Sequence, residues 1–323
     1  MTQHLVPIYD WARSLSRKGI TTTFISLIVI GFFQPEINLS IQLVIALIAV
    51  LVGIPHGAID HLIAIPSKPR YKFFSYIFIY VAMAIAAGWA ISTWNVVGFQ
   101  IVVVMSALHF GFGDASFLNE SLDSRDQPRN YFWVEVLYAL PAGFLPVVLP
   151  LTDHRTLSTL NRINPHLDNW AGPFVHEIRL SVLILAVSAI VILLFKGYSS
   201  LSTDLLLLLL LSLFSPPLIS FAAYFGFWHA LRHTARLVPK LQKSNQLAID
   251  GQWRASIRGA ITPGLYAVVG TILIAGGLMA RNPEKFSSSL LWSTLVIVWA
   301  LTVPHMLTTL GLDVKALKSD KSS

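Results

Sequence analysis

Ten histidines are spread along the chain, and six of them fall inside strongly apolar segments. Imidazole binds transition metals and changes charge near neutral pH. Inside a membrane span such a group is costly unless it is paired, so each one marks a candidate functional site, although a single one is often explained by a helix-to-helix hydrogen bond. The six are His56, His61, His109, His229, His233 and His305; His4, His154, His166 and His176 lie in polar segments.

Four of the apolar-segment histidines share one depth in the expected membrane. Their spans all cross in the same direction, and at about 1.5 Å per residue each histidine falls about 55–75% of the way towards the cytoplasmic side. Ligands of one metal must share a level, whereas independent structural histidines need not. We therefore expect one metal site between helices, in the cytoplasmic half of the membrane. The four are His56, His109, His229 and His305.

His229 and His233 form the clearest chelating pair. They are four residues apart, so both project from one helix face about one turn apart. The chain has no cysteine, which leaves imidazole, Asp and Glu as the side chains that would hold a metal.

His56 and His61 are five residues apart, about 140° around a helix, and cannot both face one site. We expect His56, at the common depth, to be the ligand. Asp60 lies one turn further on the His56 face, where its carboxylate would accept the second imidazole N–H. His61 stays open as an extra ligand, a structural residue or an entrance residue.

Two more polar residues keep alternative roles. Asp114 follows His109 in the segment HFGFGD and supports that histidine only if the glycines make the helix irregular; otherwise it is a helix-end carboxylate. His305 follows Pro304, where a helix is expected to kink. It is either a spare polar group, a partner of Asp60 or a ligand.

The elements that carry these residues are expected to be transmembrane helices. Of 323 residues, 54% are hydrophobic and 12% charged, with a mean hydropathy of +0.65, whereas soluble domains average about 25% charged residues. This excludes a soluble enzyme, a nucleic-acid-binding protein and a disordered chain. Ten apolar spans are expected, at about 20–33, 39–64, 73–92, 95–117, 131–150, 178–196, 201–215, 218–238, 259–280 and 288–311.

The basic residues set the orientation of these spans. With both termini in the cytoplasm, 18 of the 23 Lys and Arg residues lie inside and five outside, as the positive-inside rule requires. A break at Pro216-Pro217 is needed for this count. We expect an all-α, polytopic bundle of about 8–10 transmembrane helices in a single domain, 1–323. It would have a polar N-terminal segment, 1–19, and a polar tail, 312–323.

The ligand types leave the metal open, since neutral imidazoles suit Fe(II), Cu, Ni or Zn. Four imidazoles on six-coordinate Fe(II) would leave two positions for dioxygen. An apolar substrate would reach a membrane site by partition, and aromatic walls suit a polyene or another flat lipid, although ordinary aromatic packing is the alternative. The aromatic candidates for a substrate tunnel are Phe110, Phe112, Tyr224, Phe225, Phe227 and Trp228.

Three motifs in order carry a resemblance to a known family: PHGAIDH at 55–61, HFGFGD at 109–114 and WHALRH at 228–233. Over about 50–310 the chain resembles the Brp/Blh family of bacterial and archaeal β-carotene 15,15'-dioxygenases. The resemblance implies that O2 cleaves the central double bond of β-carotene to give two all-trans-retinal, the chromophore of a microbial rhodopsin. It also implies a multi-pass enzyme of the bacterial inner membrane. Its non-haem Fe(II) would be held by His56, His109, His229 and His233, with no other catalytic side chain.

Three other membrane functions fit the sequence less well. A metal-ion or proton-coupled transporter would use the histidines and Asp60 as a relay, but the sequence has no visible repeat and few acidic residues within spans. A di-iron desaturase needs more histidines, in paired boxes that include HxxHH. A rhodopsin needs a lysine inside a span for its Schiff base, and no expected span contains one.

Overall fold

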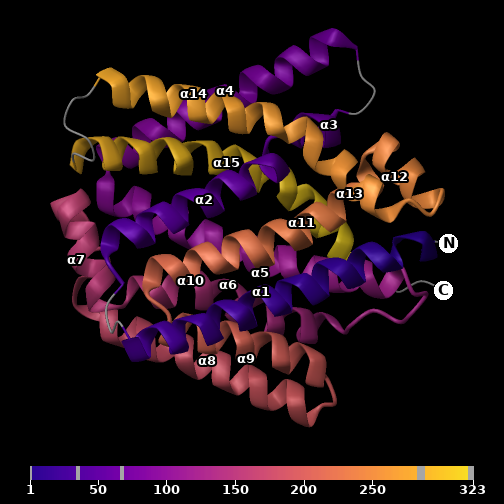
Figure 1. The fold of residues 1–323 in the computed structure, drawn as a ribbon, viewed down its shortest axis with the longest axis horizontal. Coiled ribbons are helices and arrows are strands. Elements are labelled where there is room, and N and C mark those ends of the chain that lie inside the picture. The colour runs from indigo at the N-terminus through magenta and orange to yellow at the C-terminus, as the bar shows by residue number, and fades with distance from the viewer. Residues whose placement is uncertain (1, 34–36, 66–68, 282–287, 319–323) are drawn as a thin grey trace.

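A computed structural model describes residues 2–33, 37–65, 69–281 and 288–318, and every regular element in these ranges is a helix. Figure 1 shows the long helices side by side in one bundle, with the start of α1 and the end of α15 at the same end. The long helices are α1 (Val6–Phe33), α2 (Leu39–Gly57), α4 (Arg70–Thr93), α5 (Asn95–Asp123), α6 (Phe132–Leu151), α8 (Val175–Phe195), α14 (Leu265–Arg281) and α15 (Ser288–Lys318).

Shorter helices connect or continue these long ones. A π-helix, η4 (Tyr224–His229), joins α10 to α11 without a break in the chain's helical course. π-Turns within helices are frequent at functional sites. The other short α-helices of the described chain are α3 (Asp60–Ala64), α7 (His154–Ile163), α9 (Ser199–Phe214), α10 (Pro217–Ala223), α11 (Ala230–Leu237), α12 (Gln242–Ile249) and α13 (Trp253–Ile261), and there are 3-10 turns at Gln3–Leu5, Pro165–Leu167, Gly172–Phe174, Val238–Lys240 and Thr262–Gly264.

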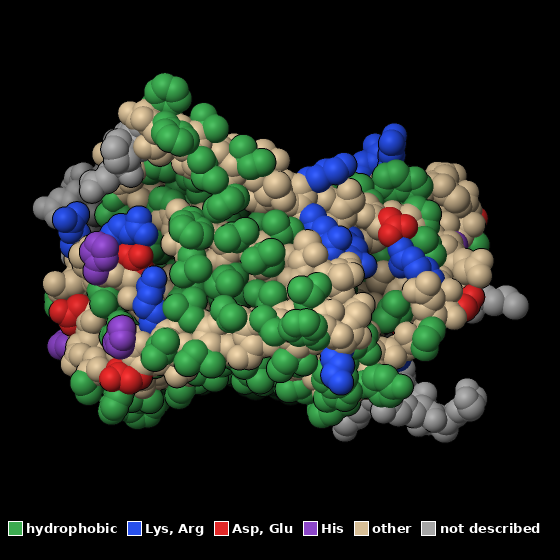
Figure 2. Space-filling model, turned by 90° about the horizontal axis from the view of Figure 1, so that it is seen from below, with side chains coloured by type: hydrophobic (Ala, Val, Ile, Leu, Met, Phe, Trp, Pro, Cys, Tyr) green, Lys and Arg blue, Asp and Glu red, His purple; other side chains and the backbone are tan. Residues whose placement is uncertain are grey.

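Eight helical segments of the described chain are long and apolar enough to cross a membrane, so this is a multi-pass membrane protein. On the face in Figure 2, hydrophobic side chains cover the middle of the molecule and charged side chains gather towards its two ends. A bilayer is the solvent that suits such a band. The segments are Gln3–Phe33, Leu39–Ala64, Arg70–Thr93, Asn95–Asp123, Phe132–Leu151, Gly172–Phe195, Trp253–Leu273 and Trp292–Val314.

The ten expected spans are all largely helical, and the expected break at Pro216-Pro217 is present because α9 ends at Phe214 and α10 begins at Pro217. Two of the ten do not qualify as long spans. Helix α9 has 16 residues, and the stretch expected at 218–238 is divided among α10, η4 and α11. The all-α, polytopic fold is confirmed.

Both polar ends are more helical than expected. Helix α1 already begins at Val6, because Ile8, Tyr9 and Ala12 form an apolar stripe that is buried against the bundle. At the other end α15 continues to Lys318, with Asp313 buried. The last part of the expected tail, 319–323, lies outside the described residues.

Helices α5 and α6 approach closely because glycines face each other across their contact. A Cβ atom on Gly111 would lie 2.0 Å from the carbonyl oxygen of Ala139, and one on Gly143 would lie 1.8 Å from that of Ala107. Small residues at such crossings let membrane helices pack backbone to backbone. This contact fixes α5, and with it His109, against the centre of the bundle.

Candidate metal centre

Five imidazole rings meet in the interior of the bundle, each from a different position in the chain. His56 comes from α2, His109 from α5, His229 from the end of η4, His233 from α11 and His305 from α15. All five are buried. Helices that are far apart in sequence therefore bring their histidines to one place, and we call these five residues the histidine cluster.

The spacing of the rings suits a single ion. The His56 ring centre lies 5.2 Å from that of His229, 5.0 Å from that of His233 and 5.4 Å from that of His305. The His109 ring centre lies 5.1 Å from that of His229 and 5.3 Å from that of His305. A metal–nitrogen bond of about 2.0–2.1 Å places the ring centres of neighbouring imidazole ligands about 4.5–5.5 Å apart.

Six ring nitrogens of the cluster lack a hydrogen-bond partner within the protein. Nε2 of His109, of His229 and of His305 is buried without a hydrogen-bond partner, and so are Nδ1 of His56 and both nitrogens of His233. A buried polar atom left unpaired costs about 1–3 kcal/mol, so a site with this many unpaired nitrogens fits a metal ion. In the described part of the chain, no three His, Asp or Glu side chains have donor atoms already set in metal-binding geometry.

On the outer side of the cluster, Nδ1 of His109 contacts Thr309 of α15, and Nδ1 of His305 contacts Asp60 of α3. Nδ1 of His109 lies 3.3 Å from Oγ1 of Thr309, whose hydroxyl donates to the carbonyl oxygen of His305 at 3.0 Å. With the Thr309 hydroxyl donating to this carbonyl, Nδ1 of His109 would be the donor to Thr309, and Nε2 would present its lone pair to the cluster. Nothing in the sequence pattern had pointed to Thr309.

Asp60 has a different partner from the one expected. It binds Nδ1 of His305 at 2.9 and 3.0 Å, not His56. The reason is local, because α2 ends at Gly57 and α3 begins at Asp60. The two residues are therefore not one turn apart on a continuous helix. Of the three roles left open for His305, the partnership with Asp60 is present in the structure through Nδ1, and Nε2 of the same ring has no hydrogen-bond partner.

His61 and Asp114 both lie away from the cluster. The His61 ring packs on Phe73, with centres 6.0 Å apart, and is half-buried. Asp114 accepts a hydrogen bond from Nε1 of Trp228 at 2.6 Å and one from the Tyr224 hydroxyl at 3.5 Å. It therefore supports η4 rather than His109, and its position is the buried middle of α5 rather than a helix end.

Phe110 and Phe225 border the cluster most closely among the six aromatic candidates, and Tyr224 also stacks on His229 with ring centres 6.4 Å apart. Phe110 lies 4.4 Å from His229 between ring centres, and Phe225 lies 5.8 Å from His56 and 6.0 Å from His229. These two side chains form an apolar wall beside the imidazoles.

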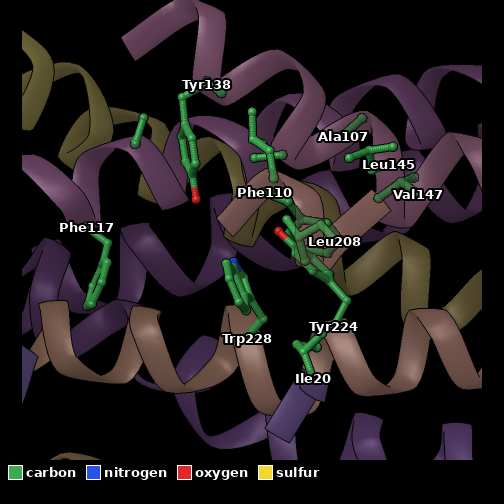
Figure 3. Close-up of a cluster of buried hydrophobic side chains, with 14 of the residues drawn as sticks. Ile20, Ala107, Phe110, Phe117, Tyr138, Leu145, Val147, Leu208, Tyr224 and Trp228 are labelled. Carbon is green, nitrogen blue, oxygen red and sulfur yellow. The ribbon is translucent and has the colours of Figure 1, made fainter. Parts of the chain in front are cut away.

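The other four aromatic candidates are placed differently. Tyr224 and Trp228 are fully buried in the core with Phe110, Phe117 and Tyr138 (Figure 3). Phe227 is half-exposed and contacts Gly19 of α1, and Phe112 is partly buried against the core. The period of a π-helix differs from that of an α-helix. The α-helical pattern therefore could not predict which aromatic side chains of Tyr224–His229 face the cluster and which face the core.

Buried ion pairs, which the sequence pattern did not reveal, hold the segment that carries His229 and His233. Arg232 binds Asp204 at 3.0 Å and lies over the Trp228 ring at 3.6 Å. Arg236 binds Glu120 at 3.1 Å and Asp313 at 2.7 Å. The expected topology places both arginines among the 18 cytoplasmic basic residues, but both are buried in the bundle.

The sequence of this chain matches a known family over most of its length. The model of the family described as "Beta-carotene 15,15'-dioxygenase" matches residues 47–313, the part of the chain that contains the whole histidine cluster. This range agrees with the motifs that suggested the resemblance.

Two curated relatives carry the same description. The "Beta-carotene 15,15'-dioxygenase" of uncultured marine bacterium 66A03 is 27% identical over 272 residues, 80% of this chain and 90% of the relative. The "Probable beta-carotene 15,15'-dioxygenase Blh" of Halobacterium salinarum is 26% identical over 306 residues, 82% of each chain. No solved structure matches the fold significantly. Membership of a carotenoid dioxygenase family indicates a metal-dependent enzyme, and by the extent of the family match this chain belongs to the β-carotene 15,15'-dioxygenase family.

Proposed function

We propose that this chain uses Fe(II) and O2 to cleave the 15,15' double bond of β-carotene into two molecules of all-trans-retinal. The observation that carries the proposal is the histidine cluster, in which five buried imidazoles present unpaired nitrogens inside a membrane protein. His56, His109, His229 and His233 would hold the iron. Neutral imidazole is a ligand type that suits Fe(II).

The reaction balances without a protein nucleophile. The C15–C15' double bond breaks, each of the two carbons gains one oxygen atom of O2, and two aldehydes result. Fe(II), when bound, supplies the activation of O2, which these side chains do not provide.

The residues of the chain supply binding, orientation and a dry environment. Thr309 would accept the Nδ1 proton of His109, so that Nε2, which has no partner within the protein, is available to the metal. Phe110 and Phe225 offer their faces to the polyene next to the imidazoles. The apolar helices around the site exclude water that would compete at the reacting carbons.

The same proposal includes where the protein works. β-Carotene would enter from the lipid, and both termini would lie in the cytoplasm at the inner membrane of a bacterium. The division of basic residues supports this orientation even without the buried Arg232 and Arg236, since 16 of the other 21 Lys and Arg residues lie on the cytoplasmic side. The start of α1 and the end of α15 lie at one end of the bundle, as two termini on the same side of the membrane require. The retinal would be delivered to a microbial rhodopsin.

The experiment is expression in bacteria that accumulate β-carotene, with chromatography for retinal and a metal analysis of the purified protein. We expect retinal, loss of carotene colour and about one iron per chain, and we expect none of these from the His56→Ala variant. Unchanged carotene with a loaded metal would contradict the proposal. The comparisons with known proteins give no support to the transporter alternative.

A further inference from the structure

We infer that His305 is a fifth imidazole ligand of the metal centre, positioned by a carboxylate and a phenol from two other helices. The inference rests on the proposed function, because it concerns the same metal. It adds a residue outside the three motifs that carry the family resemblance. The Tyr80 hydroxyl contacts the Asp60 carboxylate, and this carboxylate binds His305. The His305 ring in turn lies among the other imidazoles of the cluster.

The position of the His305 ring is that of a ligand. Its centre lies 5.4 Å from the ring of His56, 5.3 Å from that of His109 and 5.7 Å from that of His233, as close as the other members of the cluster lie to one another. Its Nε2 atom is buried and has no hydrogen-bond partner. A purely structural histidine would have no reason to bury one nitrogen unpaired.

The other nitrogen of His305 is fully committed. Nδ1 donates to the carboxylate of Asp60, whose two oxygens lie 2.9 and 3.0 Å away. The Tyr80 hydroxyl from α4 donates to the same carboxylate at 3.3 Å. Metal-binding histidines usually donate their second N–H to such a carboxylate, which fixes the tautomer and makes the free nitrogen a better donor to the metal.

The charge of Asp60 gives a second argument. Asp60 is buried in the membrane-spanning region, where an isolated carboxylate is costly. Within the described residues its only ion-pair partner is His305, not a Lys or Arg side chain. An imidazole bound to a divalent cation would supply the positive charge that offsets this carboxylate.

A glycine and a proline lie next to His305. Gly57, at the end of α2, lies beside the ring, and a Cβ atom there would be 3.4 Å from Nδ1 of His305. Pro304 precedes the histidine inside α15, where a proline removes a helical hydrogen bond. With five imidazoles, a six-coordinate ion would keep one open position instead of two.

The test compares metal binding by the purified full-length protein and by its variants, with Co(II) as a spectroscopic probe and Fe(II) for affinity. We expect His305→Gly to bind metal about 100-fold more weakly, with Co(II) d–d bands that change in position and intensity, and added imidazole to restore the bands. Asp60→Asn is expected to weaken binding about 10-fold. The matched control is His61→Ala, one residue from Asp60 but outside the cluster, which should leave affinity and spectrum unchanged.

The outcomes separate this inference from the proposed function. If the parent protein forms retinal while His305→Gly keeps the parent's affinity and Co(II) spectrum, the fifth ligand is refuted and the function stands. If the parent protein binds no metal at all, both the fifth ligand and the proposed function are refuted. Should His305→Gly not accumulate, Tyr80→Phe and Asp60→Asn carry the test, and unchanged metal affinity in both refutes the inference.

Discussion

Trp228 donates its indole N–H to the carboxylate of Asp114 at 2.6 Å, across the contact between η4 and α5. Both side chains are buried. The bond ties the π-helical turn that ends at His229 to the helix that carries His109, so the relative position of two cluster histidines depends on it.

Loss of that bond should weaken both the fold and the metal site. We expect Trp228→Phe to lower the free energy of unfolding by about 1.5–3 kcal/mol, the range for a hydrogen bond to a charged group. The melting temperature in detergent and the bound metal measure the two effects. Phe227→Leu, the neighbouring substitution at a half-exposed ring, is the control; equal losses in both variants would contradict the assignment.

The cluster histidines should be separable from the histidines of the polar segments by alanine substitution. Removal of a ligand is expected to abolish retinal formation and lower bound iron, because the remaining imidazoles hold the ion less tightly. Retinal and metal content are measured on the same preparations. The variants expected to fail are His56→Ala, His109→Ala, His229→Ala and His233→Ala; those expected to match the parent are His154→Ala and His176→Ala. Iron loss in the second pair would refute the site.

The close contact between α5 and α6 predicts a strict size limit at Gly143. Gly143→Val should prevent correct assembly, because its Cβ would lie 1.8 Å from a backbone oxygen that cannot move independently. The measurement is the yield of monodisperse protein in detergent. Gly311→Ala, on α15 with open space around its Cβ, should be tolerated. Normal yield from Gly143→Val would mean that α5 and α6 are further apart.

Buried and surface ion pairs should differ in their effect on stability. Arg232→Ala leaves Asp204 buried without one of its cationic partners, and breaking such a pair costs about 3–5 kcal/mol. Arg155→Ala removes a surface partner of Asp153, worth about 0–1 kcal/mol. Thermal unfolding of both variants gives the comparison, and similar melting temperatures would argue against a buried network.

Phe225 should act on the substrate rather than on the metal. Its ring lies beside His56 and His229, so Phe225→Ala is expected to lower the rate of retinal formation about 10-fold through loss of polyene alignment. Bound iron should stay at the parent level. Parallel assays of β-carotene turnover and metal content check this, and a loss of iron would assign Phe225 to the support of the histidines instead.

The sequence by itself determined the membrane setting, the helical fold and the histidines that meet. Apolar runs specify helices because each span must satisfy its own backbone hydrogen bonds in lipid. The i, i+4 spacing of His229 and His233, and the common depth of His56 and His109, are local properties that survive folding. The Pro216-Pro217 break was likewise readable, since proline cannot continue an ordinary helix.

Only the tertiary structure decided the partners of these residues. Asp60 pairs with His305, 245 positions away, because α2 ends at Gly57 and redirects the chain. Asp114 binds Trp228 since a π-turn shifts which side chains of that segment face α5. A one-dimensional pattern gives the face and depth of each residue, but which helices become neighbours depends on packing over the whole bundle.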